Sequence, residues 1–180
     1  MSSTEIRITG AHEAPYQLGE PMFVYEANTL LGILDPVPVM NDGTRLHIEA
    51  FSPTQVVLDE QRHIGRLIFF EICAFVSEQF PQIQAISFSF ARPIASLGGP
   101  AQQAAARAHA LERIGVEDLQ IVPMTSGLHV VSGTWPYSSR NYAALSVALE
   151  DQRAIYRAEP ISRRAQRKGG IASAIRRLIG

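Results

Sequence analysis

Residues 56–90 constrain the fold of this chain more than any other stretch. They read VVLDEQRHIGRLIFFEICAFVSEQFPQIQAISFSF. The stretch begins with two β-branched residues and continues through a turn into a run with apolar residues at helical spacing, which Pro81 ends. This pattern predicts a strand, then a helix over residues 59–79 with Asp59 as its N-cap, then a strand over residues 85–90. Gly65 is expected in the first turns of that helix.

The rest of the chain also mixes strands with helices. Asn41-Asp42-Gly43 is a strong turn signal and predicts a hairpin. Further strands are predicted over residues 22–34, 44–51, 119–123 and 128–132, and further helices over residues 101–114, closed by Gly115, and 141–157, opened by Ser138-Ser139. We therefore predict an α/β fold in which a mixed, mostly antiparallel sheet is flanked by helices.

Charge and turn residues divide the chain into three parts. Residues 1–21 hold turn formers and are predicted to be irregular, residues 22–159 form the domain, and residues 160–180 form a basic tail. Seven of residues 157–180 are basic and one is acidic, so their +6 leaves −7 on the rest of a chain whose total is −1. The tail is predicted to dock on the acidic body of the domain, or to reach an anionic surface or acidic partner.

Composition excludes several classes of protein. The single cysteine, Cys73, rules out a disulfide framework and a cysteine-based zinc site, and its place in the helical pattern predicts an inert packing residue. We expect no metal. No apolar run reaches the length of a transmembrane helix, and the N-terminus lacks the pattern of a signal peptide, so a cytoplasmic location is expected. The acidic body carries no nucleic-acid-binding motif, so no nucleic-acid partner is expected.

The order of these elements, together with the helix sequence AARAHALERIG that ends at Gly115, resembles the GNAT superfamily of N-acetyltransferases. The resemblance covers residues 22–135, and a more distant likeness extends to the acyl-homoserine-lactone synthases. It implies an acyl-CoA N-acyltransferase-like fold. It also implies transfer of an acyl group to an amine acceptor from a thioester donor, either acyl-CoA or an acyl carrier protein.

The resemblance places the donor-binding turn at Arg62, His63, Ile64, Gly65 and Arg66. Two registers of the family's basic–x–x–Gly–x–Gly pattern remain open. One matches Arg62 and Gly65 and puts Leu67 at the last small position, whereas the other makes Gly65 the last glycine and puts Glu60 at the basic position. Small residues matter here because they let a pyrophosphate approach the backbone N–H groups at a helix N-terminus.

Glu49 is the candidate general base, acting directly or through water, and its alternative role is that of a solvated strand carboxylate. His47 is expected to be partly buried and hydrogen-bonded. Leu111 stands where the family often has a proton-donating tyrosine, and the strand 44–51 lacks the arginine typical of lactone synthases, which argues against lactone synthesis. The alternative is therefore a non-catalytic, GNAT-like binding or regulatory protein. An opening between the strand before Arg62 and residues 85–90 would favour the enzyme.

Overall fold

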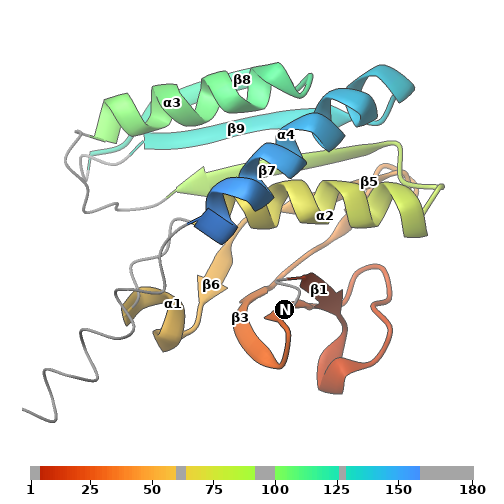
Figure 1. The fold of residues 1–180 in the computed structure, drawn as a ribbon. Helices are drawn as coiled ribbons and strands as arrows, with labels where there is room; N and C mark the ends of the chain where they lie inside the picture. The colour runs from red at the N-terminus through yellow and green to blue at the C-terminus, as the bar shows by residue number, and fades with distance from the viewer. Residues whose placement is uncertain (1–4, 60–63, 92–99, 126–128, 159–180) are drawn as a thin grey trace, which may run out of the picture.

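A computed structural model of the chain describes residues 5–59, 64–91, 100–125 and 129–158 (Figure 1). The predicted α/β class is confirmed: mixed and antiparallel strands are flanked by helices. The described strands divide between two sheets, and one helix lies between them in Figure 1. The predicted basic tail and the centre of the predicted donor turn, Arg62 and His63, lie outside the described residues.

The first sheet has four antiparallel strands in the order β1-β2-β3-β6. Its strands are β1 (Ile6–Thr9), β2 (Met22–Glu26), β3 (Thr29–Leu34) and β6 (Phe51–Pro53). The prediction of an irregular segment over residues 1–21 is therefore wrong for Ile6–Thr9. The sequence IRIT alternates apolar and polar residues, so Ile6 and Ile8 pack against the core while Arg7 stays exposed.

The single strand predicted over residues 22–34 is in fact a hairpin. Ala27 adopts a left-handed conformation (φ 51°) and turns the chain between β2 and β3. Alanine gives no turn signal, and the one turn former beside it, Asn28, stands within an otherwise apolar and strand-like stretch, so the break is not predicted. Gly32 is required by packing rather than by its backbone angles, since a Cβ there would overlap the Phe51 ring and the Ser52 carbonyl of β6.

The second sheet has five strands in the order β4-β5-β7-β9-β8. They are β4 (Val39–Met40), β5 (Arg45–Ile48), β7 (Ala85–Ala91), β9 (His129–Pro136) and β8 (Glu117–Pro123). β5 and β7 run parallel, and the other neighbours are antiparallel. The predicted hairpin at Asn41-Asp42-Gly43 is confirmed, as it joins β4 to β5.

The predicted long helix begins later than expected. Residues Gln55–Asp59 form a separate short helix, α1, and α2 spans Gly65–Gln79, so Asp59 is not its N-cap and residues 56–58 are not a strand. β6 ends at Pro53, which has no N–H to extend the pairing with β3, and the chain turns into α1 from there. Gly65 is the first residue of α2, as predicted.

Helix α2 is the centre of the molecule. Its residues from Leu67 to Cys73 are all buried, as is Val76. A helix buried on every side must be covered from several directions. The first sheet, the second sheet and helix α4 supply that cover, and Tyr16 adds edge-on ring contacts with Phe75 and Phe80.

Helices α3 (Pro100–Arg113) and α4 (Ser139–Ala158) contribute to the same core as α2 and the apolar face of the second sheet. That face carries Leu46, Ile48, Ile86, Phe88 and Trp135, all almost fully buried. The indole N–H of Trp135 donates a hydrogen bond to the carbonyl of Ile114 at 2.9 Å, which ties the sheet to the end of α3. Within the described residues, no helix is long and apolar enough to cross a membrane.

The other two predicted helix caps are confirmed. Gly115 follows α3 in a left-handed conformation (φ 87°), which a glycine adopts without strain. At the start of α4, the Ser138 hydroxyl accepts a hydrogen bond from the backbone N–H of Asn141 at 3.1 Å and caps the helix.

Candidate functional site

The two parallel strands of the second sheet separate partway along their length. β5 pairs with β7 from Arg45↔Ala85 to Ile48↔Phe88. Beyond Ile48 the chain leaves this sheet and enters the other one as β6, which pairs with β3. β7 continues to Ala91, paired on its other side with β9. The edge of β7 beyond Phe88 therefore has no strand beside it among the described residues.

Glu49 lies at the point where the two strands separate. It and Ala50 form the connection from β5 to β6, and both are exposed. Its carboxylate has no ion pair or hydrogen bond with the described residues. An exposed carboxylate at this point can take a proton from a molecule that enters beside β7.

The described part of the predicted donor turn is Ile64, Gly65 and Arg66. The Ile64 side chain is buried and serves as the N-cap residue of α2, while Gly65 and Arg66 are exposed. A Cβ built on Gly65 would meet no atom of the described residues within 4 Å. Those residues therefore leave open space beside the first backbone amides of a 15-residue helix.

Arg66 also borders a small pocket of about 40 Å³ where α2, α3 and α4 meet. Arg113 of α3 and Asp151 of α4 line the same pocket, together with the buried Phe70 of α2. Two guanidinium groups and one carboxylate thus lie close to the start of α2.

The second sheet has a polar face that the sequence patterns predict only in part. β-strand side chains alternate between faces, so the strand neighbours His47, Ser87 and Thr134 share the face opposite the core. Ser89 and Ser132, which pair with each other, lie on this face too. All five side chains are half-buried. In the sequence, this face is indicated by the alternation of serine with apolar residues in ISFSF, residues 86–90.

His47 is hydrogen-bonded, as predicted. Its Nδ1 atom lies 2.9 Å from the Ser87 hydroxyl oxygen, and that hydroxyl lies 3.5 Å from the Leu46 carbonyl oxygen. The pair sits one residue before the strands separate. His47 was not predicted as a site residue, because only the fold brings it beside Ser87.

Two other predicted roles concern buried residues. Cys73 is fully buried in α2, and burial raises the pKa of its thiol well above the ordinary value, so it is inert as a nucleophile. Leu111 is buried in the core on α3. Within the described residues, no three metal-ligating side chains gather in one place.

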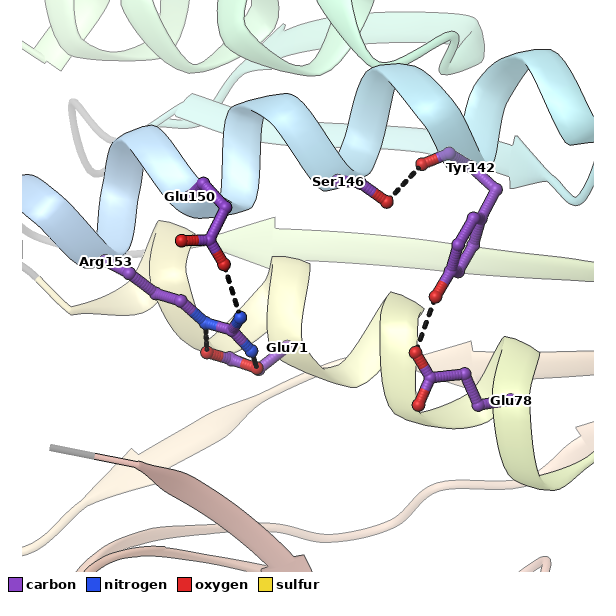
Figure 2. A network of polar contacts seen from close by, with 6 residues as sticks. All are labelled: Glu71, Glu78, Tyr142, Ser146, Glu150 and Arg153. Atoms are coloured by element: carbon purple, nitrogen blue, oxygen red, sulfur yellow. Dashed lines mark hydrogen bonds and ion pairs between the residues drawn. The ribbon is translucent and has the colours of Figure 1, made fainter. Parts of the chain in front are cut away.

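Away from this site, a polar network joins α2 to α4 (Figure 2). Arg153 donates two hydrogen bonds to the buried Glu71 carboxylate, both at 2.8 Å, and one to Glu150 at 2.7 Å. Tyr142 donates to Glu78 at 2.5 Å. Glu71, Glu78 and Arg153 line a groove of about 480 Å³ that β1 closes on its other side. Of the predicted site residues that the structure describes, Glu49, Ile64, Gly65 and Arg66, none borders this groove.

Comparison with known proteins gives structural neighbours only. No protein-family model matches the chain, and no curated protein matches it. Solved structures that resemble it include an acetyltransferase from Thermus thermophilus, at 10% identity over 66% of this chain and 64% of that one, with a TM-score of 0.37. The present chain thus spans less than two thirds of that protein's length.

Two further neighbours carry more specific names. A chimera of the spermidine N-acetyltransferase SpeG from Vibrio cholerae and hSSAT is 11% identical over 78% of this chain and 98% of its own, with a TM-score of 0.46. An aminoglycoside 6'-N-acetyltransferase complexed with coenzyme A is 10% identical over 64% and 71%, with a TM-score of 0.37. Such a likeness concerns the arrangement of the backbone and not a reaction.

Proposed function

We propose that this protein is an acyltransferase that moves an acyl group from a thioester donor to an amine. The observation that carries the proposal is the separation of β5 and β7 after Ile48 and Phe88, which leaves a strand edge free beside Glu49. An extended thioester arm can lie along such an edge and hydrogen-bond to its backbone groups.

The donor is held at the start of α2. Gly65 leaves the first turn of this helix open, and its unpaired N–H groups attract phosphate. Arg66 and Arg113 add positive charge nearby. Arg62 and His63 complete the turn in this proposal. Acyl-CoA carries the pyrophosphate that such a turn binds, and an acyl carrier protein is the second donor to test.

The reaction requires a deprotonated amine. Its nitrogen attacks the thioester carbonyl carbon, a C–N bond forms, the C–S bond breaks, and the thiolate leaves. A general base takes the proton from the ammonium group before or during attack. Glu49, exposed where the strands separate, is the candidate that the sequence offers for this role.

A substitution at Gly65 tests the donor site. Gly65→Glu should abolish binding of an acyl-CoA, because a carboxylate at the helix N-terminus repels phosphate and fills its space. Gly65→Ala is the matched control. It adds only a methyl group into open space and should keep the fold and bind more weakly, by a few-fold. Isothermal titration with acetyl-CoA and with longer acyl-CoA thioesters measures both variants.

The same titration decides between the proposal and its alternative. Equal affinity in wild type and Gly65→Glu would remove the start of α2 from the donor site. No binding of any acyl-CoA or acylated carrier protein by the wild type would favour a non-catalytic GNAT-like binding or regulatory protein. The buried Leu111, in place of a proton-donating tyrosine, is the observation that favours this second function.

A further inference from the structure

The most specific chemical arrangement on the polar face of the second sheet is the contact between His47 and Ser87. We propose that His47 is the proton-accepting residue of this site, with its Nε2 atom held ready as a base by Ser87. The inference rests on the proposed acyl transfer and assigns the base to His47 rather than to Glu49.

A serine hydroxyl has a single proton to donate. The Leu46 carbonyl, 3.5 Å away, can only accept that proton. If His47 Nδ1 carried no proton, this nitrogen and the carbonyl would compete for the single hydroxyl hydrogen, and only one of the two contacts could be a hydrogen bond. If Nδ1 is protonated, it donates to Ser87 at 2.9 Å and Ser87 donates to Leu46, so both contacts are satisfied. The neutral imidazole then has its lone pair on Nε2.

The position of Nε2 suits a base. His47 is half-buried, and Nε2 is not among the described buried atoms left without a hydrogen-bond partner. Nε2 has no hydrogen bond to the described residues. His47 is also one residue from the end of the β5–β7 pairing, on the face that carries Ser89 at the free edge of β7.

Rigidity distinguishes His47 from Glu49. A base works best when it is held in the orientation that proton transfer needs. The Glu49 carboxylate is exposed and sits in the connection between β5 and β6. His47 lies within a paired strand, its backbone N–H donates to the Pro38 carbonyl at 2.9 Å, and its ring is held by Ser87. Ser87 is accordingly a positioning residue.

The tautomer can be measured without substrate. Long-range ¹H–¹⁵N spectra of the uniformly ¹⁵N-labelled protein report which ring nitrogen of each histidine carries the proton, and His47→Gln assigns the signal. We expect neutral His47 to carry its proton on Nδ1. Ser87→Ala should convert it to a mixture of the two tautomers, whereas Ser132→Ala, the same change on the same face, should leave it unaltered. A proton on Nε2 in the wild type would overturn the proposal.

Turnover supplies the second measurement, with acetyl-CoA as donor and a panel of polyamines and amino sugars as acceptors. His47→Gln should lower kcat by at least a hundred-fold while leaving the Kd for acetyl-CoA within two-fold, and Ser87→Ala should lower kcat by a few-fold. Unchanged kcat in His47→Gln would overturn the assignment even with the expected tautomer. A wild type that neither binds nor turns over any donor would refute the acyltransferase function instead, and the tautomer would still decide whether His47 is a preset base.

Discussion

At the scale of single residues, the ion pair between Glu71 and Arg153 joins α2 to α4 through a buried carboxylate. The Glu71 side chain is only 8% exposed, and its two oxygens each accept one hydrogen bond from Arg153 (Figure 2). A buried carboxylate is tolerated only while it is paired. The pair therefore fixes how α4 lies on α2 rather than adding much net stability.

We expect Arg153→Met to destabilise the protein by about 2–3 kcal/mol, because it leaves Glu71 buried and unpaired. The double variant Glu71→Leu with Arg153→Met should recover most of the loss, since neither charge remains. Glu150→Gln removes only the exposed partner of Arg153 and should cost at most about 0.5 kcal/mol. Urea denaturation measures all three, and a double variant as unstable as the single one would contradict this account.

The hydroxyl of Tyr142 should lose its proton at a higher pH than an ordinary tyrosine. Its hydrogen bond to Glu78, with smaller contributions from burial and from the Glu78 charge, raises its pKa from the ordinary 10.0 to about 12. A group whose pKa is higher in the folded state stabilises that state below its unfolded pKa. This contribution is complete below pH 10 and is lost as the pH rises to about 12. The tyrosinate absorbance of wild type minus Tyr142→Phe gives the pKa, and Glu78→Gln should lower it.

At the scale of secondary-structure elements, the end of α3 depends on a glycine for two separate reasons. Gly115 has a positive φ, and a Cβ there would overlap the side chain of Asn141. Asn141 is itself fixed, since its amide donates to the Pro136 carbonyl at 2.9 Å. The turn after α3 is therefore held against the start of α4.

A pair of matched substitutions separates the two reasons. Gly43→Ala imposes the same backbone strain, at φ 89°, but meets no atom within 4 Å, so it should cost about 1 kcal/mol. Gly115→Ala adds a steric overlap to that strain and should cost about 2–3 kcal/mol. Thermal unfolding compares them, and equal losses would show that Asn141 moves aside freely.

How much of the fold could be read from the sequence differs between elements. Strong local signals, such as Asn41-Asp42-Gly43 and Gly115, located their turns correctly. The hairpin at Ala27 and the helix α1 carry no such signal, and tertiary contacts decide them. The site follows the same rule: Gly65 was predicted from its local pattern, whereas the contact between His47 and Ser87 spans 40 residues and exists only after β5 pairs with β7.

At the scale of the whole molecule, the charge is divided between an acidic body and a basic end. Residues 157–180 carry +6 and begin in the last turn of α4, which ends at Ala158. We propose that this tail contacts an anionic surface or an acidic partner. Attraction between exposed charges is screened by salt, with a Debye length of about 8 Å at physiological ionic strength.

Binding of the full chain to anionic lipid vesicles should therefore weaken as salt rises, and truncation after Glu159 should abolish it. Vesicles of neutral lipid are the control. The truncated protein should keep most of its melting temperature, since Pro160 and Gly169-Gly170 mark the tail as a separate segment in the sequence. A large drop in melting temperature would show instead that the tail packs on the domain's own body.

The central position of α2 has a consequence for how the protein unfolds. The first sheet, the second sheet and α4 all use this helix to cover their apolar sides. Loss of any one of them exposes α2 residues that are otherwise fully buried, such as Phe70, Ile72 and Cys73. Partial unfolding of either sheet therefore has a high free-energy cost. The two sheets, although they share no strand pairing, are expected to unfold together as one cooperative unit.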